Sequence, residues 1–329
     1  MMAYSRLGSV RKTILWQNLL GDSNGYSSWH RSYRTQGDWG KLRSMIIKRV
    51  EDRAGEYPVK AIVPVAKEVI EARTRVIRGV SLLMKVVPVV SCKFCPEVFV
   101  GKEGHLIETC KGYKRIGKKR VHEWIPGSLN DILVPVESYH LPDMSPKVIK
   151  HDERFDFDRV PAVAELCSQA GAESDQHSPQ QDNGIDDSAA SSLAPENVRS
   201  LANGTLKAWE TLRSGVEKLL LVYPAKVCKH CSEVHVGASG HKARHCGVFK
   251  YESWRGTHFW EKAGVDDLVP PKIVWSRRSQ DPPILCNEGR DFYGHAPALV
   301  DLCAKAGAVV PTKYFCMMKV QGLSPRRGW

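Results

Sequence analysis

CKFCPEVFVGKEGHLIETC, residues 92–110, holds three cysteines and one histidine, and it returns as CKHCSEVHVGASGHKARHC at residues 228–246. A constant offset of 136 residues relates the two clusters, and the same offset carries the HEW triplet at 122–124 onto HFW at 258–260. The closing segments VPAVAELCSQAGA and APALVDLCAKAGA are related in the same way. The chain therefore contains one unit twice, and a residue present in both copies meets a requirement of the unit itself.

Both copies predict the same order of elements. Apolar residues at three- and four-residue steps indicate an opening helix over 65–86 and again over 205–222, each followed by a proline. The Cys-x-x-Cys turn with its β-rich flanks predicts a small hairpin. After the HEW or HFW triplet we expect a proline-bounded irregular segment. A last helix is expected to start near Pro161 or Pro297 and to end at a glycine.

The repeated cysteines and histidine have the spacing of metal ligands. A Cys-x-x-Cys turn supplies two thiolates, and one histidine with a third cysteine completes a tetrahedral set typical of structural zinc. An iron–sulfur cluster is the main metal alternative. A thioredoxin-like pair is disfavoured because neither motif opens a helix in a βαβ pattern, and buried unligated cysteines are the remaining reading. We predict two zinc ions, one per copy, with the ligands Cys92, Cys95, His105 and Cys110, and Cys228, Cys231, His241 and Cys246.

Two further residue types repeat outside these clusters. His122 and His258 could replace a ligand or contact RNA, but we expect them to be packed structural histidines. Cys167 and Cys303 lie on the apolar face of the last helix, where core packing is the better interpretation.

The composition favours a basic protein with a polyanionic partner. The net charge is +12, with 42% hydrophobic and 26% charged residues, which favours nucleic acid among partners. No apolar run approaches the about 18 residues that span a bilayer, so we expect no integral membrane protein. No Walker motif, dinucleotide fingerprint or nucleophile elbow appears. We therefore expect a binding protein with no catalytic residues and no small-molecule substrate.

The segments after the cysteine clusters suit single-stranded or looped RNA. KGYKRIGKKR at 111–120 has six basic residues, and GVFKYESWRG at 247–256 has three aromatic residues. Basic side chains neutralise phosphates, and aromatic rings stack on unpaired bases at about 1–3 kcal/mol each. Solvated loops with ordinary core aromatics are the alternative. The predicted RNA contacts are Lys111, Tyr113, Lys114, Arg115, Lys118, Lys119, Arg120, Phe249, Lys250, Tyr251, Trp254 and Arg255.

These features define a fold class and a domain plan. The predicted fold class is α+β, with two tandem copies of a small zinc-braced helix/β-hairpin/helix unit joined by a flexible acidic linker. The first residues are basic, acid-free and amphipathic, which is typical of a mitochondrial presequence. A plastid presequence and an ordinary basic tail are the alternatives. The predicted boundaries are a presequence at 1–35, a basic extension at 36–59, repeat 1 at 60–172, the linker at 173–200, repeat 2 at 201–312 and a tail at 313–329.

The doubled unit, with Cys-x-x-Cys, GKEGH or GASGH, HEW or HFW and the closing LC-x-x-AGA helix, resembles the plant organelle APO family, named for accumulation of photosystem one. KFCPEVFVGKEGHLIETC, HEWIPGSLNDILVPVESYHL and RFDFDRVPAVAELC are most similar to its mitochondrial branch, and the resemblance covers roughly residues 40–312. It implies two APO domains that bind zinc and RNA, with the zinc ligands predicted above. It also implies support of organellar intron splicing or transcript processing for respiratory complexes, alongside other splicing factors.

Three functions are compatible with these sequence features. The first is a non-catalytic module that binds intron RNA. The second is an assembly or scaffold factor that acts through protein contacts, because the resemblance also links the family to complexes containing 4Fe–4S clusters. The third is a metal-dependent nuclease that uses His122 or His258. It is disfavoured because Glu123 becomes Phe259 in the second copy, so no acid–histidine pair repeats.

Overall fold

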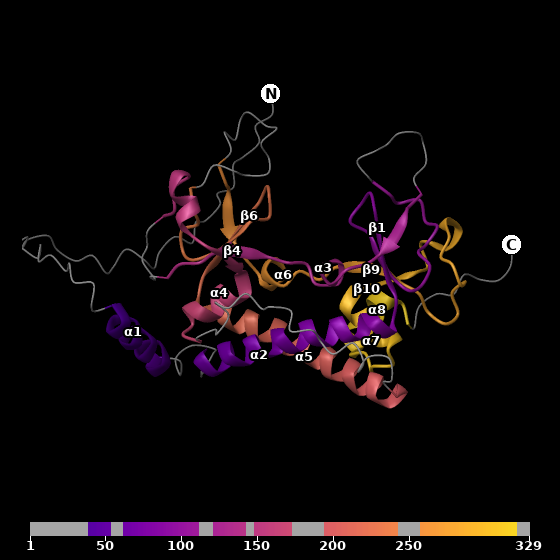
Figure 1. The fold of residues 1–329 in the computed structure, drawn as a ribbon, viewed down its shortest axis with the longest axis horizontal. Helices are drawn as coiled ribbons and strands as arrows, with labels where there is room; N and C mark the ends of the chain where they lie inside the picture. The colour runs from indigo at the N-terminus through magenta and orange to yellow at the C-terminus, as the bar shows by residue number, and fades with distance from the viewer. Residues whose placement is uncertain are drawn as a thin grey trace, which may run out of the picture.

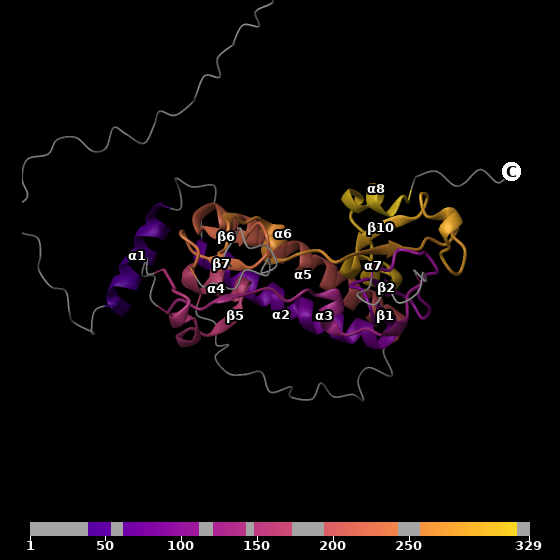
Figure 2. The ribbon, with the colours of Figure 1, turned by 90° about the horizontal axis from the view of Figure 1, so that it is seen from above.

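The structure is a computed structural model that describes residues 39–53, 62–111, 121–142, 148–172, 194–242 and 257–320. The predicted presequence, most of the predicted linker and the end of the predicted tail lie outside these residues. Two lobes rise from the same side of a pair of long helices (Figure 1; seen from above in Figure 2). Within the described residues no helix is both long enough and apolar enough to cross a membrane.

The two long helices are the opening helices of the repeats, α2 (Ile62–Val86) and α5 (Pro195–Val222). Buried residues recur along each at three- and four-residue steps, as the sequence predicts. They approach closely at glycines, since a Cβ at Gly79 would lie 2.0 Å from Thr205 Oγ1 and a Cβ at Gly215 would lie 2.3 Å from Val69 Cγ2. Adding 136 to Gly79 and Val69 gives Gly215 and Thr205, so the repeat relates each of these contacts to the other. The helices are therefore antiparallel and related by an approximate twofold axis.

Each cysteine cluster belongs to a three-stranded antiparallel sheet. In repeat 1 the strands are β1 (Val89–Cys92), β2 (Val98–Val100) and β3 (Trp124–Pro126), in the order β2-β1-β3. In repeat 2 they are β6 (Ala225–Cys228), β7 (Val234–Val236) and β8 (Trp260–Lys262), in the order β7-β6-β8. The predicted hairpin is present in both copies. The aromatic triplet adds a third strand that the sequence pattern does not reveal.

The segment after the triplet is more regular than expected. In repeat 1 it contains α3 (Leu129–Ile132), β4 (Glu137–Tyr139), a 3-10 turn (Asp152–Asp156), β5 (Arg159–Pro161) and α4 (Ala162–Gln169). In repeat 2 it contains α6 (Val265–Leu268), β9 (Ile273–Ser276), a 3-10 turn (Asn287–Gly289), β10 (Gly294–Pro297) and α7 (Ala298–Lys305). The β4–β5 and β9–β10 pairs join strands about twenty residues apart. Periodicity within either short strand cannot show that pairing.

The last helices follow the sequence prediction. Pro161 and Pro297 precede α4 and α7, and both helices end at glycines with positive φ, 88° at Gly171 and 90° at Gly307. After each glycine, a backbone N–H returns to the carbonyl of Cys167 or Cys303 at 3.0 and 2.9 Å, which satisfies an orphan helix carbonyl. Both cysteines are fully buried.

The repeats exchange their second halves, an arrangement that the sequence prediction of two tandem copies does not include. The cysteine sheet of repeat 1 packs on β9 and α7, and that of repeat 2 packs on β4 and α4. From α7, Lys305 Nζ donates to the Val100 carbonyl at 2.5 Å, and from α4, Gln169 Nε2 donates to the Val236 carbonyl at 3.0 Å. These are the same contact under the 136-residue offset. Each lobe is thus built from both repeats.

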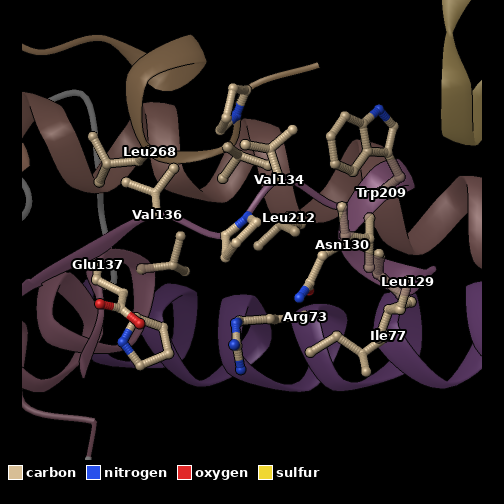
Figure 3. A pocket seen from close by; sticks show the side chains of 17 residues that line it. Arg73, Ile77, Leu129, Asn130, Val134, Val136, Glu137, Trp209, Leu212 and Leu268 are labelled. Atoms are coloured by element: carbon tan, nitrogen blue, oxygen red, sulfur yellow. The ribbon is translucent and has the colours of Figure 1, made fainter. Parts of the chain in front are cut away.

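The chain crosses between the lobes at α3 and α6, where Leu133 forms an isolated bridge with Pro271. One hydrophobic core runs through both repeats. A cavity of about 310 Å³ lies beside this crossing, with Arg73 and Ile77 entering from α2 and Leu212 from α5 (Figure 3). Its lining is mostly apolar and comes from both repeats.

The fold extends beyond the predicted repeat boundaries. Helix α1 (Trp39–Arg53) lies within the predicted basic extension, and Arg43 donates to the Ser168 carbonyl at 2.7 Å. Helix α5 begins at Pro195, inside the range predicted as linker, with proline in its first turn. A 3-10 turn (Thr312–Tyr314) begins at the predicted last residue of repeat 2, and α8 (Phe315–Met318) follows it. Tyr314 Oη donates to Glu210 at 2.5 Å.

Candidate metal centres

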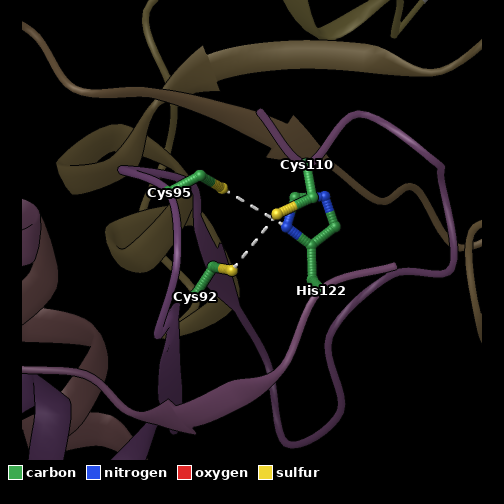
Figure 4. Close-up of side chains that lie close together, drawn as sticks. All are labelled: Cys92, Cys95, Cys110 and His122. Atoms are coloured by element: carbon green, nitrogen blue, oxygen red, sulfur yellow. Dashed lines mark hydrogen bonds between the residues drawn. The ribbon is translucent and has the colours of Figure 1, made fainter. Parts of the chain in front are cut away.

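Three cysteines and one histidine meet at the tip of the first lobe. The ligand atoms of Cys92, Cys95, Cys110 and His122 all lie within 4.8 Å of one another (Figure 4). Cys92 Sγ is 3.9 Å from Cys110 Sγ, and Cys95 Sγ is 3.4 Å from His122 Nδ1. Cys92 ends β1 and pairs with Trp124, the first residue of β3, and His122 lies two residues before Trp124, so the β1–β3 pairing brings Cys92 and His122 together.

This geometry fits tetrahedral zinc. Zinc–sulfur bonds of about 2.3 Å and zinc–nitrogen bonds of about 2.0 Å place tetrahedral sulfurs about 3.8 Å apart and sulfur and nitrogen about 3.5 Å apart. In the structure the sulfur–sulfur distance is 3.9 Å and the sulfur–nitrogen distance is 3.4 Å, each close to the value for tetrahedral zinc. Three thiolates with one imidazole are also a common structural zinc set. The four residues therefore fit the ion that the sequence predicts.

His105, the predicted imidazole ligand, lies behind His122 instead. It is fully buried, its Nδ1 accepts from the Ile107 N–H at 3.2 Å, and its Nε2 lies 3.0 Å from Glu97 Oε2. Because Nδ1 accepts, Nε2 carries the proton and donates to the carboxylate, so both ring nitrogens are occupied. Spacing alone favours His105 as a ligand. The strand pairing favours His122, since the Lys93 N–H donates to the Glu123 carbonyl at 2.9 Å.

Glu97 links the two histidines. Its Oε2 lies 3.5 Å from His122 Nε2, while Thr109 Oγ1 lies 3.1 Å from the same nitrogen. A carboxylate behind a ligating histidine sets the ring orientation and leaves the other nitrogen for a metal. The partners of Glu97 keep its pKa low even though burial raises it, the hydrogen bond to His105 being the largest of these opposing effects.

The second lobe repeats this arrangement. Cys231 Sγ lies 3.3 Å from His258 Nδ1, and Cys228 completes a described group of three. Glu233 lies 3.3 Å from His241 Nε2 and 3.4 Å from His258 Nε2. Burial raises the pKa of Glu233, but His241 and Arg159 outweigh it and hold that pKa at about 2. Cys246 lies outside the described residues.

A repeated tryptophan and glycine complete the packing behind each site. Trp124 stacks on His122 with ring centroids 4.9 Å apart, and its Nε1 donates to the His105 carbonyl at 3.3 Å. A Cβ at Gly104 would lie 2.1 Å from the Trp124 ring, so only glycine fits there. In the second lobe Trp260 makes the matching hydrogen bond at 3.0 Å. These contacts explain why HEW and HFW share their first and third residues.

The opposite repeat supports each centre. The Trp275 ring of repeat 2 packs edge-on against the His105 ring, with centroids 6.1 Å apart. The Tyr139 ring of repeat 1 packs in the same way against the His241 ring, with centroids 5.1 Å apart. In the second lobe, Arg159 of repeat 1 donates to Glu233 of repeat 2 at 2.9 Å. Backbone hydrogen bonds also join the repeats, from Leu106 to Leu285 and from Lys242 to Ile149, both at 2.8 Å. Each candidate centre therefore depends on residues from both repeats.

The pKa values of the two Cys-x-x-Cys thiols in the first lobe are shifted in opposite directions. Burial raises the pKa of Cys92, but backbone N–H groups of Phe94 and Cys95 outweigh it, so that pKa is lowered. The pKa of Cys95 is raised to about 12, first by burial and then by its neighbour Cys92. Full deprotonation of both Cys92 and Cys95 is therefore favoured only when a cation, such as a metal ion, lies beside them.

The predicted RNA contacts lie almost entirely outside the described residues. Lys111 is described and exposed, whereas the other residues of 111–120 and all those of 247–256 are outside. Sequence reasoning missed the carboxylates Glu97 and Glu233. A signal was present, because both follow the Cys-x-x-Cys turn at the same place and are related by the 136-residue offset.

Comparisons with known proteins agree with the repeat. The APO RNA-binding family model matches residues 33–185 and again 184–321. Arabidopsis thaliana "APO protein 2, chloroplastic" is 40% identical over 297 residues, which cover 80% of this chain and 68% of that protein. "APO protein 1, chloroplastic" is 37% identical, covering 87% and 74%, and "APO protein 3, mitochondrial" is 32% identical, covering 82% and 75%, from the same plant. No solved structure matches the chain. The chain belongs to the APO RNA-binding family, as the doubled motif predicts.

Proposed function

We propose that this protein is a non-catalytic, organellar RNA-binding protein whose two lobes each hold one structural zinc ion. Membership of the APO RNA-binding family is the observation that carries the proposal. The net charge of +12 and the paired Cys/His clusters support it. The basic and aromatic segments at 111–120 and 247–256 remain the proposed RNA-contacting segments.

The proposed zinc ligands differ from the sequence prediction in one residue per lobe. His122 and His258 replace His105 and His241, because their Nδ1 atoms face the cysteine sulfurs. The proposed ligand sets are Cys92, Cys95, Cys110 and His122 in the first lobe, and Cys228, Cys231 and His258 in the second. Cys246, which lies outside the described residues, completes the second set as the counterpart of Cys110. A bound zinc ion would supply a fixed crosslink at the lobe tip. The chain's own contribution is to orient each imidazole from Glu97 or Glu233.

The proposed biological role is to promote intron splicing or transcript processing for respiratory complexes. It rests on the family and on the presequence predicted at the N-terminus, which favours the mitochondrion. The named relatives include chloroplastic and mitochondrial proteins, so the chloroplast is the alternative compartment. A fluorescent fusion of the full chain, viewed beside mitochondrial and plastid markers, separates the two.

Crosslinking of the tagged protein to RNA in the organelle where it accumulates tests the function. Enrichment of a few intron-containing transcripts over an untagged control is the expected result. The rival function is an assembly factor for complexes with 4Fe–4S clusters, favoured by the ability of three cysteines and one histidine to hold such clusters. Recovery of RNA no better than the control, together with stable protein partners, would support that rival.

A further inference from the structure

Each lobe carries an exposed phenylalanine beside a lysine at its metal-binding tip. In the first lobe, Lys93 Nζ lies 5.7 Å from the centroid of the Phe94 ring. In the second, Lys229 Nζ lies 5.7 Å from the centroid of the Phe259 ring. The two phenylalanines are 39% and 48% exposed. Both rings are thus partly open to solvent, although the Phe259 ring also meets the His230 ring edge-on with centroids 6.1 Å apart.

The two rings come from different positions of the repeat. Phe94 corresponds to His230, and Phe259 corresponds to Glu123, whereas the lysines correspond to each other. The positions converge because the N–H of Lys93 donates to the carbonyl of residue 123, and the N–H of Lys229 donates to that of residue 259, both at 2.9 Å. A phenylalanine thus lies beside the equivalent lysine in both lobes, from either of two neighbouring places. A packing requirement would fix one place, whereas a surface that needs a ring at the tip allows either.

We propose that these two tips, Lys93 with Phe94 and Lys229 with Phe259, bind single-stranded RNA by stacking an unpaired base on each phenylalanine. The inference deepens the proposed RNA-binding function and rests on it. The ring supplies the stacking surface, and the lysine beside it approaches the adjoining phosphate. Both lysines are exposed and pair at the surface with Glu123 and Glu261, at 2.8 and 3.5 Å. Exposed pairs of this kind are weak and exchange readily for a phosphate.

The shape of the molecule favours binding of one RNA strand to both tips at once. The two cysteine sheets rise from the same side of α2 and α5 (Figure 1). A strand held at one tip is therefore presented to the other at a raised effective concentration. Duplex RNA is a poor ligand for such tips, because its bases are already stacked in the helix.

The test measures the affinity of the purified full-length protein for an unstructured single-stranded RNA oligonucleotide and for a duplex of the same length. The variants are Phe94→Ala and Phe259→Ala, each paired with the tyrosine substitution that keeps a ring. Leu221→Ala serves as the control, because Leu221 is 53% exposed and belongs to α5, outside both cysteine sheets. Zinc content and circular dichroism confirm that each variant keeps its fold and both ions.

We expect each alanine variant to bind single-stranded RNA about five- to 150-fold more weakly, the range set by stacking one base. Its salt dependence should stay unchanged because no charge is lost, whereas Lys93→Gln should lower the salt slope by about 0.7. The tyrosine and Leu221 variants should bind normally. Normal binding by both alanine variants, or equal affinity of the wild type for the duplex, would overturn the stacking sites while leaving RNA binding intact. A wild-type protein that binds neither RNA would instead refute the proposed function.

Discussion

The choice of histidine ligand can be tested by removing each candidate separately. In the first lobe, His122 Nδ1 lies 3.4 Å from Cys95 Sγ, whereas both nitrogens of His105 are occupied by Ile107 and Glu97. His122→Ala should therefore remove a ligand. His105→Ala should remove only a support behind it. The second lobe offers an independent repeat of the experiment with His258 and His241.

The expected magnitudes follow from the number of ligands. Structural zinc binding of about 10–16 kcal/mol, shared over four ligands, amounts to about 2.5–4 kcal/mol per ligand. His122→Ala should therefore weaken zinc binding at its lobe by roughly 70- to 900-fold. His105→Ala leaves four ligands and loosens Glu97, which should cost about 10- to 100-fold. Chelator competition measures both losses.

Because these ranges overlap, the coordination geometry decides. Cobalt(II) replaces zinc and reports its ligands through its visible absorption. The His105→Ala protein should keep the wild-type spectrum at both sites. The His122→Ala protein should show one altered or empty site. If His105→Ala changes the spectrum and His122→Ala does not, the ligand assignment is wrong.

Three further predictions test the interlocked fold. Gly79→Ala should destabilise the protein by about 1–2 kcal/mol in a denaturant titration, since its Cβ would lie 2.0 Å from Thr205 Oγ1. Gly204→Ala, whose Cβ would meet nothing within 4 Å, should stabilise the protein by about 0.5–1 kcal/mol in the same titration. Equal effects of the two substitutions would contradict the helix contact. Lys305→Met should cost about 2–4 kcal/mol, because the buried Asp301 carboxylate keeps its hydrogen bond from Ser276 but loses the cation that lies 2.7 Å from its Oδ2. An unchanged midpoint would exclude this bridge. Neither repeat expressed alone should be a folded monomer, although the two should co-purify when expressed together; a single repeat with a dispersed amide spectrum as a monomer would refute the exchange of halves.

The sequence predicts the parts of each lobe better than their assembly. The 136-residue offset correctly identifies the repeat, and periodicity and proline positions locate the long helices and the helices after Pro161 and Pro297. The exchange of halves is invisible at this level. The two copies carry similar residues, so β2 could pack on β4 of its own repeat as plausibly as on β9 of the other. That choice is made by the antiparallel packing of α2 on α5 and by the crossing at α3 and α6.

The ligand set shows the same division between local and non-local information. Cys92 and Cys95 follow from a local motif, and the structure brings Cys110 to them. His122 reaches the sulfurs only because β3 pairs with β1, a contact that spacing along the chain does not encode. The start of α5 at Pro195 was missed for a different reason. Its first turns are polar, and their composition resembles the acidic segment before them.

The most direct test of the account is the affinity of the full-length protein for single-stranded RNA before and after its metal is removed. Because both lobe tips are held together by the proposed zinc ligands, the metal-free protein should lose high-affinity binding and regain it when zinc is added back. Unchanged affinity in protein shown to contain no metal would contradict the claim that zinc-braced lobes form the RNA-binding surface.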